Sequence, residues 1–206
     1  MAYRSVCISP TDGSGGELVG PMVAEALGFQ LLNTQIVTRA AEEAGVDPEA
    51  VRDAEGRRTL AVRLLGRLAA DAGPPVDAEG AADDDGPDPE ALREVIRAVI
   101  LEAGERGDAV IVTHAASYAL ADRSDVLRVL ITASPASRAD RIAEAKGWSD
   151  AAAEKAIRRG DAGRADYLKR FYAVDAESPT DYDLVIDTDT VDAEAAAELI
   201  IRTARP

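Results

Sequence analysis

A short glycine-rich segment near the start of the chain has residue types that suit phosphate binding. Residues 12–17, with the sequence Asp-Gly-Ser-Gly-Gly-Glu, lie between an apolar stretch and a stretch with helical spacing. A glycine-rich turn that leads into a helix N-terminus gathers backbone N–H groups and the positive end of the helix dipole, and both attract phosphate. The segment therefore predicts a phosphate-binding loop, whose cofactor-binding residues are Asp12, Gly13, Ser14, Gly15, Gly16 and Glu17.

The loop lacks the side chains that complete a phosphate loop of the form G-x-x-x-x-G-K-[ST]. On that pattern Gly16 stands in place of the lysine, and Glu17 stands in place of the hydroxyl residue that holds Mg²⁺. A carboxylate ~4 Å from a phosphate oxygen costs roughly 4 kcal/mol at an effective dielectric constant of 20. Two interpretations of Glu17 stay open: an acid of the first helical turn that faces solvent, which we favour, or a metal ligand.

Strand-like and helix-like segments alternate along the chain, which predicts an α/β fold with a parallel sheet covered on both faces. Apolar runs predict five strands, at residues 3–9, 29–32, 109–113, 126–132 and 183–187. Amphipathic spacing and caps predict helices at residues 17–27, 34–43, 59–71, 89–105, 136–146, 149–172 and 193–203, with another that opens at 47–49. Two glycines predict a break at residues 160–163 of the long helix.

Length and charge limit the classes of protein to consider. The 206 residues suffice for a single domain over residues 1–206 with its own core. The formal charge of −15 argues against nucleic acids and anionic membranes as partners, because both would repel the chain. Residues 73–88 are rich in Asp, Gly and Pro and are interpreted as a flexible acidic insertion, which overlaps an acidic run over residues 77–90.

Other features favour a cytoplasmic protein. No apolar run approaches the ~18 residues that a membrane span needs, and the first residues lack a signal-peptide pattern. The single cysteine, Cys7, excludes an internal disulfide and is expected to be a small buried core residue.

The ordered set of segments resembles the cytidylate kinase-like family of P-loop nucleoside monophosphate kinases. The segments that carry the resemblance are the glycine loop and residues 24–28, 109–114, 126–134, 161–165 and 182–188. The resemblance implies a P-loop kinase-like three-layer sandwich with a five-stranded parallel sheet and a helical lid at residues 149–172. It also implies phosphoryl transfer from ATP, with Mg²⁺, to a nucleoside monophosphate, a reaction that depends on cations around the phosphates.

The same resemblance supplies the remaining candidate residues. It implies catalytic roles for His114, Asp161 and Arg164. It implies that Arg138 and Arg141 contact the cofactor phosphates. It also implies that Asn33 and Arg39 hold the acceptor nucleotide. Asn33 is equally well explained as a helix N-cap. His114 is equally well explained as a structural residue, although the carboxyl end of a strand is where open α/β sheets bind ligands. No residue is assigned as a resident metal ligand.

Three functions stay open. Two of them involve a nucleotide or another phosphorylated small molecule as the ligand, and the third does not. We favour a nucleotide-binding protein whose phosphoryl transfer is weak, altered or lost, because Gly16, Glu17 and His114 replace cationic or metal-binding groups. The first alternative is an active kinase for (d)CMP or another nucleotide that uses arginines in place of the loop lysine. The second is a non-catalytic interaction or regulatory module. An oligomer is compatible with each of them.

Overall fold

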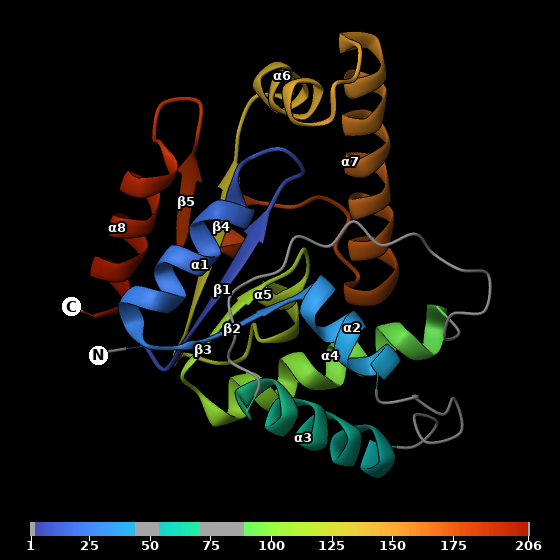
Figure 1. Ribbon diagram of the computed structural model, residues 1–206, viewed down its shortest axis with the longest axis vertical. Helices are drawn as coiled ribbons and strands as arrows, with labels where there is room; N and C mark the ends of the chain where they lie inside the picture. Colours follow the sequence, from blue (N-terminus) through green and yellow to red (C-terminus); the bar gives the residue numbers. More distant parts are fainter. Residues whose placement is uncertain (1–2, 44–53, 71–88, 206) are drawn as a thin grey trace. The chain divides into compact units, whose positions relative to one another are not determined.

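The computed structural model describes residues 3–43, 54–70 and 89–205. They form one five-stranded sheet, in the order β2-β3-β1-β4-β5 (Figure 1). β1 pairs in parallel with both β3 and β4, and β4 pairs in parallel with β5, so the predicted α/β class with a parallel sheet is confirmed. The strands are β1 (Ser5–Pro10), β2 (Gln30–Asn33), β3 (Ala109–Val112), β4 (Val126–Thr132) and β5 (Leu184–Asp187).

The helices follow the predicted order where the structure describes the chain. They are α1 (Gly16–Leu27), α2 (Thr34–Glu43), α3 (Ala54–Ala70), α4 (Pro89–Arg106), α5 (Ala116–Ala119), α6 (Pro135–Lys146), α7 (Asp150–Tyr172) and α8 (Ala193–Ala204). The short helix α5 was not predicted. The helix expected to open at 47–49 and the acidic insertion at 73–88 lie outside the described residues.

The chain divides into two compact units. One comprises Met1–Leu31 with Asp108–Pro206, and the other comprises Leu32–Gly107. In the second unit α2, α3 and α4 pack against one another and bury apolar side chains such as Val37, Leu64 and Val99. The single domain over residues 1–206 stays a prediction.

The core of the first unit lies between the sheet and two helices. α1 and α8 lie side by side and pack against each other (Figure 1). Their buried Val23 and Ile200 belong to the same apolar cluster as Ile8 and Val129 of the sheet. The middle strands are buried on both faces, which explains their almost continuous apolar sequence. Cys7 is fully buried, and burial raises the pKa of its thiol to about 12.

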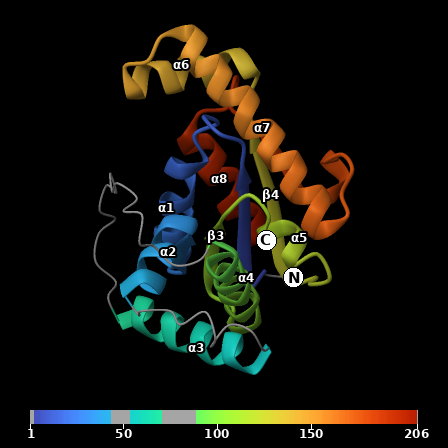
Figure 2. The same cartoon turned by 90° about the vertical axis from the view of Figure 1, so that its right-hand side faces the viewer.

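α6 and α7 form a helical pair in the same unit, and they lie side by side in Figures 1 and 2. α7 begins after Ser149, whose hydroxyl accepts a hydrogen bond from Ala152 N, and continues to Tyr172. The break predicted at residues 160–163 is therefore wrong. A glycine inside a helix costs only about 1 kcal/mol, and Ile157 and Leu168 are buried on either side of the two glycines.

Gly160 has a packing role instead. A Cβ atom at this position would overlap the carboxylate of Asp12 in the glycine loop, whereas a Cβ at Gly163 would meet open space. The first glycine therefore permits a close approach between α7 and the loop.

No helix in the described ranges combines the length and apolar character that a membrane crossing would require.

Candidate phosphate-binding site

The glycine loop connects β1 to α1 at the carboxyl end of a central strand. Gly13 and Gly15 have φ angles of 75° and 81°, a conformation that glycine adopts without steric cost. Gly15 is the N-cap residue of α1, and no side chain caps the helix there. The turn therefore requires glycine at two positions and leaves the first amides of the helix uncapped.

Two loop glycines also lie against other parts of the chain. A Cβ on Gly13 would lie 2.7 Å from the carbonyl oxygen of Arg138, and a Cβ on Gly16 would overlap the side chain of Pro10. In this loop conformation position 16 therefore has no room for the lysine that a complete phosphate loop carries.

The carbonyl groups of the loop are all hydrogen-bonded. Pro10 O accepts from Arg164 Nη1 (3.1 Å), Asp12 O from Arg138 Nη1 (3.3 Å) and Gly13 O from Arg141 Nη1 (3.3 Å). Thr11 O and Gly15 O accept from the amides of Ser14 and Leu18, both at 3.0 Å. Ser14 O accepts from the hydroxyl of Thr188 at 2.8 Å. The acceptors of the loop are thus occupied by the protein itself.

The amide groups of the loop show the opposite pattern. Of the amides at residues 12–17, those of Asp12, Gly13, Gly15, Gly16 and Glu17 donate no hydrogen bond within the described part of the chain. The hydroxyl of Ser14 is also buried without a partner in the described ranges. A backbone turn with bonded carbonyls and unbonded amides carries net positive potential and binds anions.

Three arginines surround the loop, but carboxylates hold two of them. Arg138 donates two hydrogen bonds to Asp161, at 2.8 and 2.7 Å, and Arg164 donates two to Glu177, at 2.8 and 2.5 Å. Arg141 instead donates to the hydroxyl and carbonyl oxygens of Thr188. Of the three, only Arg141 has no carboxylate within ion-pair distance in the part of the chain described.

The paired arginines are firmly charged. The hydrogen bonds that Arg138 donates to Asp161 are the main reason that the pKa of Arg138 lies above its usual value. For Arg164 burial acts to lower the pKa, but the hydrogen bond and charge of Glu177 outweigh it, so the pKa is raised. Neither guanidinium can lose its proton near neutral pH, and each pair is electrically neutral overall.

His114 and Asp12 complete the polar surroundings of the loop. His114 follows β3, and its Nδ1 lies 3.0 Å from Pro10 O and 3.0 Å from Arg164 Nη1. Its Nε2 lies 3.6 Å from Asp12 Oδ1, and both side chains are about half exposed. The structure therefore brings the single histidine to the loop.

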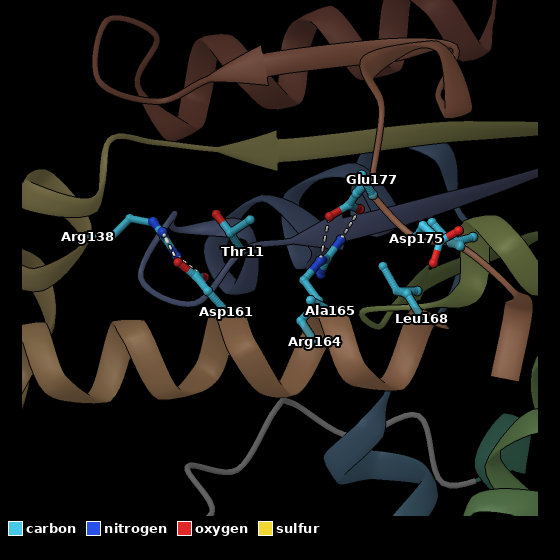
Figure 3. A pocket seen from close by; sticks show the side chains of 10 residues that line it. Thr11, Arg138, Asp161, Arg164, Ala165, Leu168, Asp175 and Glu177 are labelled. Atoms are coloured by element: carbon cyan, nitrogen blue, oxygen red, sulfur yellow. Dashed lines mark hydrogen bonds and ion pairs between the residues drawn. The ribbon is translucent and has the colours of Figure 1, made fainter. Parts of the chain in front are cut away.

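A cavity of about 230 Å³ lies between the loop, α7 and the segment that follows α7. Thr11 separates the Arg138–Asp161 pair from the Arg164–Glu177 pair in Figure 3, and all five residues line the cavity. The rest of the lining consists of Asp175 and of apolar residues such as Leu168 and Val174. The cavity thus combines an apolar wall with two neutralised cations.

Residues 5–190 match the model of the cytidylate kinase-like family. The chain belongs to the cytidylate kinase-like family. No curated protein matches the chain significantly.

Solved structures show the same fold as this cytidylate kinase-like protein. An uncharacterized protein from Eubacterium ventriosum ATCC 27560 has a TM-score of 0.61 at 19% identity, with 97% of each chain covered. Shikimate kinase from Bacteroides thetaiotaomicron has a TM-score of 0.55 at 14% identity over 100% of both chains. Shikimate kinase from Acinetobacter baumannii, in complex with shikimate, has a TM-score of 0.52 at 14% identity, covering 98% of this chain and 93% of its own. The predicted P-loop kinase-like fold is confirmed.

Most of the predicted site residues of this cytidylate kinase-like protein gather at the loop. The residues that the structure brings together there are Asp12, Gly13, Ser14, Gly15, Gly16, His114, Arg138, Arg141, Asp161 and Arg164. Glu17 lies in the first turn of α1 with an exposed side chain. Their ligand-binding roles stay predictions.

The two residues predicted to hold the acceptor nucleotide belong to the other compact unit. Asn33 and Arg39 belong to the unit Leu32–Gly107. Asn33 Oδ1 accepts a hydrogen bond from Ile36 N at 2.7 Å, so Asn33 does cap α2. The side chain of Arg39 lies outside the described part of the structure.

The prediction missed three residues that shape the site: Glu177, Thr188 and Tyr182. The hydroxyl of Tyr182 donates to Glu177, and Arg164 Nη2 lies 3.4 Å from the same hydroxyl. Thr188 directly follows β5, and a polar residue at the carboxyl end of a parallel strand was a usable signal. Glu177 lies in no recognisable motif.

Proposed function

We propose that this protein binds the phosphate groups of a nucleotide, or of another phosphorylated small molecule, with the backbone of its glycine loop. We further propose that its ATP-dependent phosphoryl transfer to a nucleoside monophosphate is weak, altered or lost. The observation that carries the binding proposal is the asymmetry of the loop. Its carbonyls are bonded to the protein, whereas the amides of Gly13, Gly15 and Gly16 are not.

Weak transfer follows from the state of the cations. Phosphoryl transfer needs positive charge that is free to follow the charge developing on the phosphate oxygens, and one such arginine is worth about 10³-fold or more in rate. Here Arg138 and Arg164 are each neutralised by a carboxylate, and position 16 has no space for a lysine side chain.

The donor set fits a polyphosphate, and it also accommodates Mg²⁺ bound to that polyphosphate. Mg²⁺ needs only one or two carboxylates in addition to phosphate oxygens and water. Asp12 and Glu17 are exposed carboxylates of the loop. The described ranges contain no cluster of three or more metal-ligating side chains. Mg²⁺ would therefore enter with the nucleotide, and its role would be to neutralise phosphate charge.

An active kinase is the second candidate, and one observation favours it. Arg138, Arg141 and Arg164 all donate to loop carbonyls, so their guanidinium groups already stand beside the proposed phosphate site. A coupled assay with ATP, Mg²⁺ and CMP, dCMP, UMP or AMP separates the two candidates. Turnover above about 1 s⁻¹, within the ordinary range of kinases, would contradict weak transfer. Calorimetric binding without turnover supports it, and the absence of any binding would favour an interaction module.

The substitution Glu17→Lys should tighten ATP binding about tenfold, which corresponds to about 1.4 kcal/mol. A cation then replaces an anion in the first turn of α1, and solvent screening keeps the effect near this size. Isothermal titration calorimetry at low and high salt checks the result, because the gain should shrink as salt rises. Glu25→Lys is the matched control, since it makes the same charge change on an exposed position of the same helix. An equal gain in both variants would contradict a local effect.

The acceptor role of Asn33 can be separated from its capping role. We expect Asn33→Ser to keep the free energy of unfolding within about 0.5 kcal/mol of the wild type, because serine caps helices equally well. If the side chain also contacts the acceptor, CMP affinity should fall about tenfold in the same variant. Urea denaturation and calorimetry provide the two readouts. Unchanged CMP affinity would leave Asn33 as a cap alone.

A further inference from the structure

Two buried arginines share the cavity beside the glycine loop, and each is bound by a carboxylate from the protein itself. The side chains of Arg138 and Arg164 are 5% and 8% exposed. Such guanidinium groups are suited to bidentate recognition of an anion, which is the geometry that Asp161 and Glu177 adopt (Figure 3). The carboxylates thus stand where the anionic groups of a ligand in this cavity would bind.

We infer that Asp161 and Glu177 are internal competitors, which the anionic groups of the ligand must displace from Arg138 and Arg164. The inference rests on the proposed phosphate-binding function and names the ligand class that the site selects. A ligand with two or more anionic groups, such as a polyphosphate, gains enough to exchange with both carboxylates. A single phosphate does not.

The donors of Arg164 show why exchange is required. Its Nε donates to Glu177, its Nη1 lies at Pro10 O and His114, and its Nη2 lies at Glu177 and Tyr182. Every nitrogen of this guanidinium already has a partner. A ligand can therefore reach Arg164 only by replacing Glu177.

Arg138 is less completely satisfied. Its Nε is buried with no hydrogen-bond partner in the described ranges, although both Nη atoms are bonded. Its partner Asp161 is 43% exposed, so this carboxylate regains water easily when it leaves. Glu177 is 21% exposed and is also bound by the hydroxyl of Tyr182, so its release costs more. Glu177 is the stronger competitor, and we assign it the larger effect on affinity.

The substitution Glu177→Gln tests the inference with two opposed readouts. Glutamine keeps the size and one acceptor oxygen but removes the charge that competes with the ligand. We expect inorganic tripolyphosphate to bind the Glu177→Gln variant at least tenfold more tightly than it binds the wild type, as measured by calorimetry. The melting temperature of the ligand-free variant should fall, because Arg164 loses its counter-charge, and saturating tripolyphosphate should restore it. A residue with a merely structural role would lower stability without tightening binding.

Matched variants complete the experiment. Glu154→Gln removes an exposed carboxylate that pairs with Arg158 on the same helix, and it should leave both readouts unchanged. Asp161→Asn should tighten tripolyphosphate binding by about threefold to fivefold, and it decides the question if Glu177→Gln does not fold. Equal or weaker binding in the tested variant would overturn the inference, as would an equal gain in Glu154→Gln. If the wild type and all variants bind neither tripolyphosphate nor ATP, the proposed function fails as well.

Discussion

The substitution Arg164→Ala is expected to lower the free energy of unfolding by about 3–5 kcal/mol, the usual cost of removing one partner of a buried ion pair. Glu177, 21% exposed, would keep its charge without its guanidinium partner, and Pro10 O would lose a donor. Urea denaturation followed by circular dichroism measures the change. The same variant should lose measurable tripolyphosphate binding, because one cation of the cavity is gone.

Two further variants identify the physical reason for the loss of stability in Arg164→Ala. Arg158→Ala removes an arginine of the same helix from an exposed pair, and it should change stability by no more than about 0.5 kcal/mol. The double variant Arg164→Met/Glu177→Leu should recover much of the stability lost in Arg164→Ala, since no buried charge then lacks a partner. A double variant no more stable than Arg164→Ala would show that packing, not charge, explains the effect.

The substitution Gly13→Ala should cost about 2–4 kcal/mol of stability and abolish phosphate binding by the loop. Alanine at a φ of 75° is strained by about 1–2 kcal/mol, and its Cβ would lie 2.7 Å from the backbone oxygen of Arg138. A backbone oxygen cannot move aside without shifting α6. Denaturation and ATP calorimetry provide the two measurements.

Gly163→Ala is the control for that substitution and should act in the opposite direction. This glycine lies inside α7, and a Cβ there would meet no atom within 4 Å. Alanine should therefore stabilise the protein by about 0.5–1 kcal/mol, because it has the higher helix propensity. Equal losses in both variants would contradict the conformational argument for Gly13.

The strands and most helices were predictable because burial imposes simple patterns on them. β1 and β4 lie inside a parallel sheet, so residues such as Val6, Ile8 and Val129 must be apolar on both faces. The continuity of α7 through its two glycines was not predictable, because a glycine that ends a helix and one that permits close approach look alike in sequence. Gly160 is of the second kind, and its neighbour Asp12 is remote in sequence.

The candidate site also contains features that were predictable from the sequence and features that were not. The loop glycines were predictable, since a backbone conformation restricts residue type locally. The partners of the arginines were not, because long side chains choose partners through tertiary contacts. Arg138 pairs with a residue that the resemblance had singled out, Asp161, whereas Arg164 pairs with Glu177, which no pattern marked. The sequence therefore predicted where cations gather but not that carboxylates neutralise two of them.

The hydroxyl of Thr188 has a consequence for local opening of the fold. Its Oγ1 lies within 3.2 Å of Ser14 O, Thr132 O and Arg141 Nη1, so one side chain joins the glycine loop, β4 and α6 just beyond the edge strand β5. Fraying at the end of β5 would withdraw that hydroxyl and release the loop with it. Amide hydrogen exchange in the loop and at the sheet edge should then rise in parallel, as one cooperative unit.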